Sequence, residues 1–235
     1  MAVNVLPAPA DKAAAVRAMF DRIAPRYDRL NAILTLRLDR GWRRRAIAAA
    51  ALGPGSVAVD MACGTGDFCA LAAATGARVV GVDFAAGMLA GAQRRGIPAA
   101  LVRGDALQLP VRAGVADAVT CGFALRNLVA IPPMLAEAAR VLRPGGRLVL
   151  LEVGEPCHPL ARLGHHLYFH RLVPLIGALL ADRRAYAYLP ASVAYLPAPD
   201  ALRAMIVRAG FANVRMQTLG AGAAQLVTAE REGTA

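Results

Sequence analysis

A glycine-containing turn that follows a short apolar segment carries the residues best suited to chemistry. Asp60, Gly64 and Gly66 lie in the sequence VAVDMACGTGD, which runs from residue 57 to residue 67. Glycines between a strand and a helix let the backbone approach a ligand closely, and the first N–H groups of the helix then point at that ligand. The turn therefore predicts a ligand site. The alternative is a tight strand-to-helix connection that binds nothing.

Two further carboxylates indicate what kind of ligand the turn accepts. Asp83 ends the next predicted strand, seventeen residues after Gly66, where an acid can accept hydrogen bonds from two vicinal ribose hydroxyls. Asp105 follows the third predicted strand, within Gly104-Asp105-Ala106, and is suited to an adenine amino group. Together the three segments predict a ligand that contains a nucleoside.

The residues around the turn distinguish between two nucleoside cofactors. A nicotinamide dinucleotide site places a third glycine beneath the pyrophosphate, but Cys69 occupies that place here. An acid, Asp60, precedes the glycines instead. The pattern resembles the three cofactor motifs of class I S-adenosylmethionine-dependent methyltransferases, with Ala62 at their usual first glycine: Asp60-x-Ala62-x-Gly64-x-Gly66, Asp83 and Gly104-Asp105-Ala106. A nicotinamide-dependent oxidoreductase is the disfavoured alternative.

The elements that must position these residues alternate between short apolar strands and helices. Strands are predicted at 57–61, 78–83, 100–104, 116–122 and 147–153, with helices at 68–75, 86–95 and 131–142. Residues 11–51 are predicted to be helical, with a break at Pro25, and a helix at 199–209 precedes strands near 213–219 and 223–231. This alternation is typical of βαβ units, so the predicted fold class is α/β, a doubly wound, mostly parallel sheet.

One segment departs from this rhythm. Residues 155–196 are rich in His, Tyr, Leu and Pro, which predicts a helical insertion over the substrate crevice. His166 and His170 share a helix face there, but no third ligand accompanies them, so no metal site is expected. The length fits one domain, and residues 1–235 are predicted to form a single methyltransferase domain with N-terminal helices over 11–51.

Longer segments resemble the ubiquinone/menaquinone biosynthesis C-methyltransferase family. The most distinctive is FALRN at 123–127, within ADAVTCGFALRN at 116–127. Further segments agree: GDALQLP at 104–110, ARVLRPGGRLVLLE at 139–152, FDRIAPRYDRLN at 20–31 with the following Trp42, VPLIG at 173–177 and YAYLPAS at 186–192. The resemblance implies methyl transfer from S-adenosyl-L-methionine to a ring carbon of a prenylated quinol, either demethylmenaquinol or a ubiquinone precursor.

The same resemblance implies specific cofactor contacts. Thr65, Asp83, Asp105 and Ala106 would touch the cofactor, with Gly64 and Gly66 forming the turn and Asp60 preceding it. One departure is Gly122, where relatives commonly carry a serine near the cofactor. A side-chain hydrogen bond from that position is therefore missing.

Carbon methylation of a quinol needs a ring hydroxyl to lose its proton, and the phenolate then needs stabilisation. Arg126, permanently charged at the carboxyl end of the fourth predicted strand, suits that role, with Asn127 beside it as a neutral donor or acceptor. Because arginine is not a base at neutral pH, a bound water, Tyr27 or a histidine of residues 155–196 would relay the proton. The alternative is a helix-capping Asn127 and a surface Arg126.

Composition excludes several classes of protein. A chain that is 57% hydrophobic and 18% charged is expected to fold, and it lacks a secretory signal and a membrane-spanning run, which predicts a cytoplasmic location. Its four cysteines lack disulfide or zinc spacing.

The net charge of +11 suits nucleic acid, but the motifs of nucleic-acid methyltransferases are missing, so no nucleic-acid partner is expected. A methyltransferase for another small molecule of secondary metabolism and a non-catalytic partner subunit remain alternatives, and a homodimer is left open.

The basic N-terminal quarter also predicts contact with a membrane surface. Drawn as one helix, the segment from Leu34 to Trp42 places Leu34, Leu38 and Trp42 on one side and Arg37, Arg40 and Arg44 on the other. Such a helix can lie in the headgroup region of an anionic bilayer. We therefore expect weak, salt-sensitive peripheral association, with residues 167–180 as a second contact; the alternative is a helix packed over the active site.

Overall fold

A single sheet of seven strands forms the centre of the protein in a computed structural model, which describes residues 6–154, 156, 188 and 190–233. The strand order is β3-β2-β1-β4-β5-β7-β6, and β7 runs antiparallel to both neighbours. The strands are β1 (Val57–Met61), β2 (Arg78–Asp83), β3 (Ala100–Arg103), β4 (Ala116–Gly122), β5 (Leu142–Val153), β6 (Phe211–Leu219) and β7 (Ala224–Arg231). The order reverses between β1 and β4, which is where open α/β sheets bind their ligands.

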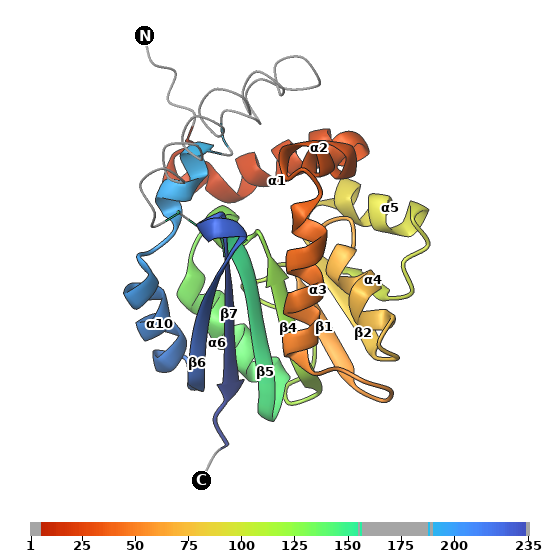
Figure 1. Ribbon diagram of the computed structural model, residues 1–235. Coiled ribbons are helices and arrows are strands. Elements are labelled where there is room, and N and C mark those ends of the chain that lie inside the picture. The colour runs from red at the N-terminus through yellow and green to blue at the C-terminus, as the bar shows by residue number, and fades with distance from the viewer. Residues whose placement is uncertain (1–5, 155, 157–187, 189, 234–235) are drawn as a thin grey trace.

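Helices cover both faces of this sheet (Figure 1). They are α1 (Lys12–Ile23), α2 (Tyr27–Leu34), α3 (Leu38–Ala50), α4 (Asp67–Ala73), α5 (Ala86–Arg94), α6 (Ile131–Val141) and α10 (Pro199–Arg208). Short 3-10 turns include η2 (Ala24–Arg26), η3 (Leu125–Asn127) and η5 (Val193–Tyr195). The seven strands and their helical layers confirm the predicted fold class.

Alternation along the strands divides the core into two layers. Ala58 belongs to a buried cluster that includes residues of α3, α4 and α5, whereas its neighbour Val59 belongs to a second cluster that includes residues of α6 and α10. Successive side chains of a strand point to opposite faces, so a strand buried on both sides reads as a continuous apolar run. The sequence around β1, β2 and β4 has this character, and their observed bounds equal the predicted ones.

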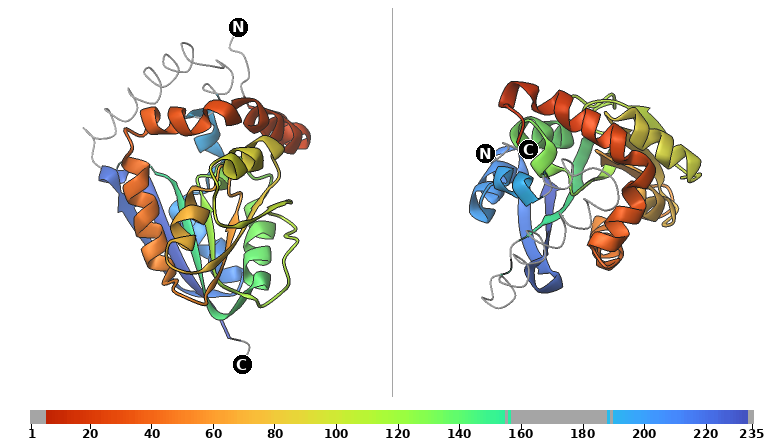
Figure 2. Two further views of the ribbon diagram at one scale, coloured as in Figure 1. Left: turned by 90° about the vertical axis from the view of Figure 1, so that its right-hand side faces the viewer. Right: turned by 90° about the horizontal axis from the view of Figure 1, so that it is seen from above.

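Helices α1 and α2 lie across the carboxyl ends of the parallel strands (Figures 1 and 2). Asp21 of α1 accepts a hydrogen bond from the backbone N–H of Gly87 at 2.7 Å, which satisfies an open donor at the start of α5. A Cβ on Gly87 would come within 3.1 Å of the Asp21 carbonyl, so glycine permits this contact. At the N-terminus of α1, Lys12 donates a hydrogen bond to the Leu128 carbonyl at 2.6 Å, and its ammonium lies 3.6 Å from the Tyr195 ring centre.

The N-terminal helical region is not continuous, and the prediction of one helix from Leu34 to Trp42 is wrong. Helix α2 ends at Leu34, and α3 begins at Leu38 after Leu36 and Arg37 adopt left-handed backbone angles, with φ of 50° and 62°. The Thr35 hydroxyl lies 2.7 Å from Asp39 Oδ1 and stabilises the turn. Trp42 is partly buried in the core rather than at a membrane-facing edge.

Two other predictions meet the structure differently. Strand β5 begins at Leu142 rather than Arg147, because Leu142 already pairs with Ala116 across an irregular register. The predicted insertion at 155–196 lies largely outside the described residues, as do all four histidines. Within the described residues, no helix is long and apolar enough to cross a membrane.

Candidate active site

A cavity opens at the carboxyl ends of β1, β2 and β4, beneath α1 and α2. Its lining includes six of the predicted site residues: Gly64, Asp83, Asp105, Ala106, Tyr27 and Asn127. Side chains of Phe20, Phe84 and Met88 add an apolar wall. The cavity thus combines backbone, carboxylate and apolar surfaces, as small-molecule sites commonly do.

The glycine turn presents its backbone to this cavity. Gly64 has φ of 56°, and a Cβ there would find no atom within 4 Å, so the residue faces open space. Gly66 has φ of 84°, and a Cβ there would press on Ile97 and Ala92, so its lack of a side chain permits close packing beneath the turn. Ala62 adopts φ of 53°, a left-handed angle at which glycine is usual. The replacement of the first glycine by alanine therefore leaves the turn geometry intact at some cost in strain.

Asp83 links the turn to the start of α5. Its Oδ2 accepts a hydrogen bond from the Gly64 N–H and its Oδ1 accepts one from the Ala85 N–H, both at 2.8 Å. The side chain is buried, and desolvation raises its pKa although the two backbone N–H groups oppose that effect. Each carboxylate oxygen retains a further lone pair, so Asp83 can hold the turn and accept from a ribose together.

The third segment completes the lining. Asp105 Oδ1 accepts a hydrogen bond from the Leu107 N–H at 2.9 Å, and Ala106 is buried beside it. A Cβ on Gly104 would lie 2.9 Å from Pro110, so a larger residue does not fit at this bend. An exposed glycine backbone and two separate carboxylates around one cavity fit the nucleoside and amino-acid portions of S-adenosylmethionine.

Asp60, Thr65 and Gly66 do not line the cavity. Asp60 is buried, where it accepts hydrogen bonds from the Thr120 hydroxyl at 2.7 Å and the Cys69 thiol at 3.4 Å. Burial raises the pKa of Asp60 to about 7. Its location supports an indirect role beneath the turn, and direct cofactor contact by these three residues stays a prediction.

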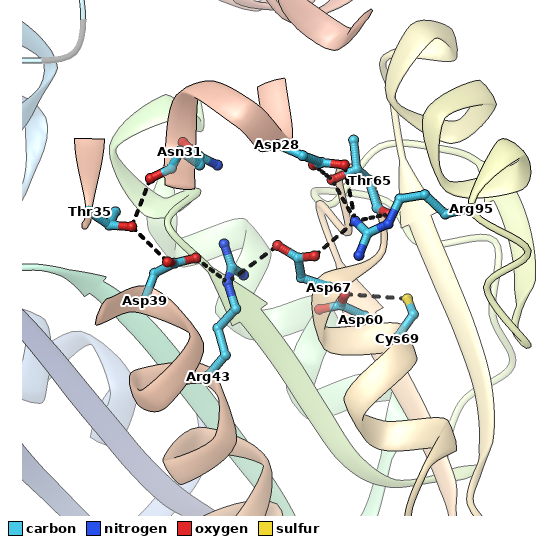
Figure 3. A network of polar contacts seen from close by, with 10 residues as sticks. All are labelled: Asp28, Asn31, Thr35, Asp39, Arg43, Asp60, Thr65, Asp67, Cys69 and Arg95. Carbon is cyan, nitrogen blue, oxygen red and sulfur yellow. Dashed lines mark hydrogen bonds and ion pairs between the residues drawn. The ribbon is translucent and has the colours of Figure 1, made fainter. Parts of the chain in front are cut away.

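A polar network joins helix α2 to the glycine turn (Figure 3). The Thr65 hydroxyl donates to Asp28 at 2.6 Å, and Arg95 donates to the Thr65 carbonyl at 2.9 Å. Arg95 also pairs with Asp67 at 2.8 Å, so helices α2 and α4 and the end of α5 meet at this point. The hydroxyl of Thr65 is therefore already engaged within the protein.

Arg43 belongs to the same network and was missed by the sequence reasoning. It is buried, pairs with Asp39 at 3.4 Å and Asp67 at 3.5 Å, and its guanidinium lies 5.4 Å and 5.1 Å from the ring centres of Phe68 and Phe123. The i, i+4 spacing of Asp39 and Arg43 was a visible signal of pairing. Its burial follows from the packing of α3 against α4, which no local pattern reveals.

The glycine at position 122 has a steric reason. A Cβ built there would lie 2.4 Å from the Phe68 ring, a separation that real atoms do not reach. The aromatic ring thus occupies the space that a serine side chain would need. The Phe68 ring therefore packs against β4 at Gly122, where a serine would have placed a hydroxyl.

The carboxyl end of β4 places Arg126 in a buried ion pair. Its guanidinium Nη1 donates to Glu152 Oε1 at the end of β5 and to the Phe123 carbonyl, the latter at 3.0 Å. Arg126 is 8% exposed, which excludes the alternative of a surface arginine. Within the described part of the chain, Arg126 Nε and Asn127 Oδ1 are buried without hydrogen-bond partners. Such atoms are costly unless a ligand satisfies them.

Tyr27 lies near this cation. Burial raises the pKa of the Tyr27 phenol, while Arg43 and Arg126 act in the opposite direction. Tyr27 lines the cavity together with Asn127, so the predicted relay residue and one predicted acceptor residue share this site. Arg126 does not line the cavity itself, but its chain neighbours Ala124 and Asn127 do. Glu152, which the sequence reasoning did not single out, holds the arginine among them.

The comparisons with known proteins agree with this geometry. The sequence matches the ubiE/COQ5 methyltransferase family over residues 9–231. A demethylmenaquinone methyltransferase from Roseiflexus castenholzii is 44% identical, covering 99% of this chain and 100% of its own length. One from Thermus thermophilus is also 44% identical, covering 91% of this chain and 100% of its own.

A solved structure supports the fold. It is titled an S-adenosylmethionine-dependent methyltransferase, possible histamine N-methyltransferase, from Thermotoga maritima. The two chains superpose with a TM-score of 0.65 at 19% identity, over 92% of this chain and 100% of that chain. At this identity the likeness concerns architecture alone.

We predict that Asp83→Ala weakens S-adenosylmethionine binding about tenfold to a hundredfold, because a hydrogen bond to a charged group contributes roughly 1.5–3 kcal/mol. Titration calorimetry of wild type and variant measures the change. Asp200→Ala, an exposed acid at the start of α10, is the matched control and should bind normally. Equal affinity in the two variants would remove Asp83 from the cofactor site.

A second prediction concerns Asp60, whose pKa of about 7 exceeds the usual value of 3.8. The folded protein holds this proton more tightly than the unfolded chain does, so the contribution to stability is full below pH 3.8 and is lost as pH rises through 7. Asp60→Asn removes this titration. Relative to wild type, the variant should gain roughly 1 kcal/mol per pH unit between pH 5 and 7.

Urea unfolding at several pH values provides the measurement for Asp60. The informative quantity is the difference in unfolding free energy between Asp60→Asn and wild type at each pH. A difference that stays constant from pH 5 to 8 would contradict the raised pKa.

Proposed function

The chain belongs to the ubiE/COQ5 methyltransferase family, and from this premise we propose that it methylates a ring carbon of a prenylated quinol. It is an S-adenosyl-L-methionine-dependent C-methyltransferase. Demethylmenaquinol is the acceptor favoured by the names of the relatives, and a ubiquinone precursor is the second candidate. One observation carries the proposal. Among the described residues, the Nε of buried Arg126 has no hydrogen-bond partner, and Arg126 lies next to residues that line a cavity suited to the methyl donor.

S-adenosylmethionine supplies an electrophilic methyl group on a sulfonium, and Gly64, Asp83 and Asp105 are the residues that would hold it. The chain's own contribution to chemistry lies at Arg126 and its neighbours. A fixed cation in a site shielded from water stabilises a phenolate oxygen more strongly than a hydrated one. Carbon ortho to that oxygen then becomes the nucleophile.

Several features support a site that excludes water. The apolar wall of Phe20, Phe84 and Met88 faces the cavity, and both α1 and α2 contribute residues to its lining. Tyr27 lines the same cavity, and its phenol is the side chain proposed to relay the ring proton. Asn127 offers an acceptor oxygen to a second hydroxyl of the ring.

The choice of acceptor is tested with purified enzyme, labelled S-adenosylmethionine and reduced quinols. A prenylated demethylnaphthoquinol and a prenylated benzoquinol precursor are supplied separately, and the products are identified by mass spectrometry. We expect transfer to the naphthoquinol. Transfer to neither quinol would overturn the proposed function and favour another small-molecule acceptor.

A peripheral contact with lipid is the second part of the proposal. Three of the exposed large apolar residues lie at the corner between α2 and α3, namely Ile33 at 43% exposure, Leu36 at 73% and Leu38 at 55%. Arg37 and Arg40 are exposed beside them. An apolar tip ringed by cations suits an anionic bilayer, in which the prenylated substrate resides.

We predict that Arg126→Lys lowers turnover about tenfold or more while S-adenosylmethionine affinity changes little. Lysine keeps the charge but loses the planar arrangement that serves Glu152 and the acceptor together. Steady-state kinetics and calorimetry on the same preparation provide the two values. Wild-type turnover in the lysine variant would exclude Arg126 from the chemistry.

The lipid contact yields a separate prediction. Leu36→Glu should reduce co-sedimentation with vesicles containing about a third anionic lipid, and binding should weaken as salt rises. Val207→Glu, at an exposed apolar residue on α10, is the matched control and should bind as wild type does. Charge reversal at Arg37, Arg40 and Arg44 should also reduce binding. Sedimentation that is absent at low salt, or equal in all variants, would show that this corner has no membrane role.

A further inference from the structure

Tyr188 is a buried phenol in an apolar cluster that borders the cavity. Its side chain is 4% exposed, and within the residues that the structure describes its hydroxyl has no hydrogen-bond partner. A buried hydroxyl without a partner is unfavourable, and native structures contain few of them. The group therefore points to something that binds there when the protein works.

The surroundings of Tyr188 connect it to the site. It belongs to one buried apolar cluster with Ala85, with Met88 of α5 and with residues of α1, and Tyr27 and Phe84 border the same cluster. Met88, Tyr27 and Phe84 also line the cofactor cavity. Tyr188 does not line the cavity itself, but it belongs to an apolar cluster whose other members do.

Arg126 lies in η3, and η3 contacts η5, which follows Tyr188 by a few residues in the chain. The Arg126 cation acts on the Tyr188 phenol and favours its ionised form, although burial is the larger effect and raises the pKa of Tyr188 to about 12. The phenol consequently keeps its proton at neutral pH. It can donate a hydrogen bond but is not a base.

Three buried polar atoms in this region are without partners among the described residues: Arg126 Nε, Asn127 Oδ1 and the Tyr188 hydroxyl. Two of them can donate and one accepts only. Their complement is a ligand that offers one oxygen as acceptor and a second hydroxyl as donor. A singly deprotonated hydroquinol has both groups on one ring.

We propose that Tyr188 is a substrate-binding residue of the methyl-acceptor site, donating with Arg126 to the phenolate oxygen of the quinol. The inference rests on the proposed function and extends it by one residue. Arg126, which is fixed by its ion pair with Glu152, supplies the positive charge. Tyr188 supplies a neutral O–H donor, whose hydrogen bond favours one orientation of the quinol oxygen. The acceptor oxygen is thus recognised by two groups from segments about sixty residues apart in the sequence.

The test compares Tyr188→Phe with Tyr195→Phe. Tyr195 is a nearby phenol whose hydroxyl donates to the Pro7 carbonyl at 3.4 Å, so it is already satisfied within the protein. Each variant is assayed for quinol methylation, S-adenosylmethionine affinity and melting temperature. For Tyr188→Phe we expect kcat/KM for the quinol to fall about tenfold to a hundredfold, with unchanged cofactor affinity.

Stability separates a binding role from a structural one. Loss of an unsatisfied buried hydroxyl should leave the melting temperature of Tyr188→Phe equal to or above that of wild type. Tyr195→Phe should keep full turnover. The double variant Arg126→Lys/Tyr188→Phe should lose less than the product of the two single losses, since both groups act on one oxygen.

Each contrary result has a distinct meaning. If wild type methylates the quinol and Tyr188→Phe does so equally well, the role of Tyr188 is overturned while the proposed function stands. A lower melting temperature together with weaker cofactor binding would assign the hydroxyl a structural role instead. If wild type binds S-adenosylmethionine but methylates no quinol, the proposed function fails and this inference fails with it.

Discussion

The buried ion pair between Arg126 and Glu152 is the interaction on which the acceptor half of the site depends. A charge removed from water must be paired, and loss of either partner leaves the other buried and uncompensated. In the parallel register of β4 and β5, Gly122 at the end of β4 lies opposite Leu151, so Glu152 of β5 lies beside the turn η3 that follows β4 and contains Arg126. The sheet therefore fixes the cation before any substrate arrives.

The cofactor half depends on the same edge of the sheet but on backbone geometry. The Asp83 carboxylate joins the Gly64 N–H to the Ala85 N–H, so the ends of β1 and β2 share one anchor. Above them, Asp21 fastens α1 to α5, and the network around Thr65 fastens α2 to the turn. Helices α1 and α2 are thus held in place by polar contacts at their edges, and they present apolar surface to the cavity.

Much of this arrangement could be predicted because it depends on patterns of neighbouring residues in the sequence. The glycine turn, Asp83 and the strands around them follow from apolar runs that end at polar residues, and FALRN indicated Arg126 and Asn127. The break at Leu36 and Arg37 could not be predicted, since neither glycine nor proline marks it and both residues take left-handed angles. Arg43, Glu152 and Tyr188 gain their surroundings from packing between distant segments, which no spacing along the chain reveals.

The central claim is that the methyl group is transferred to a ring carbon of the quinol, the carbon ortho to the phenolate oxygen that Arg126 stabilises. It is tested most directly by supplying S-adenosylmethionine with a ¹³C-labelled methyl group and prenylated demethylnaphthoquinol under reducing conditions, then recording the carbon spectrum of the product. The account predicts a signal from a methyl group bonded to a ring carbon. A signal from a methyl ether, or none at all despite bound cofactor, would contradict it.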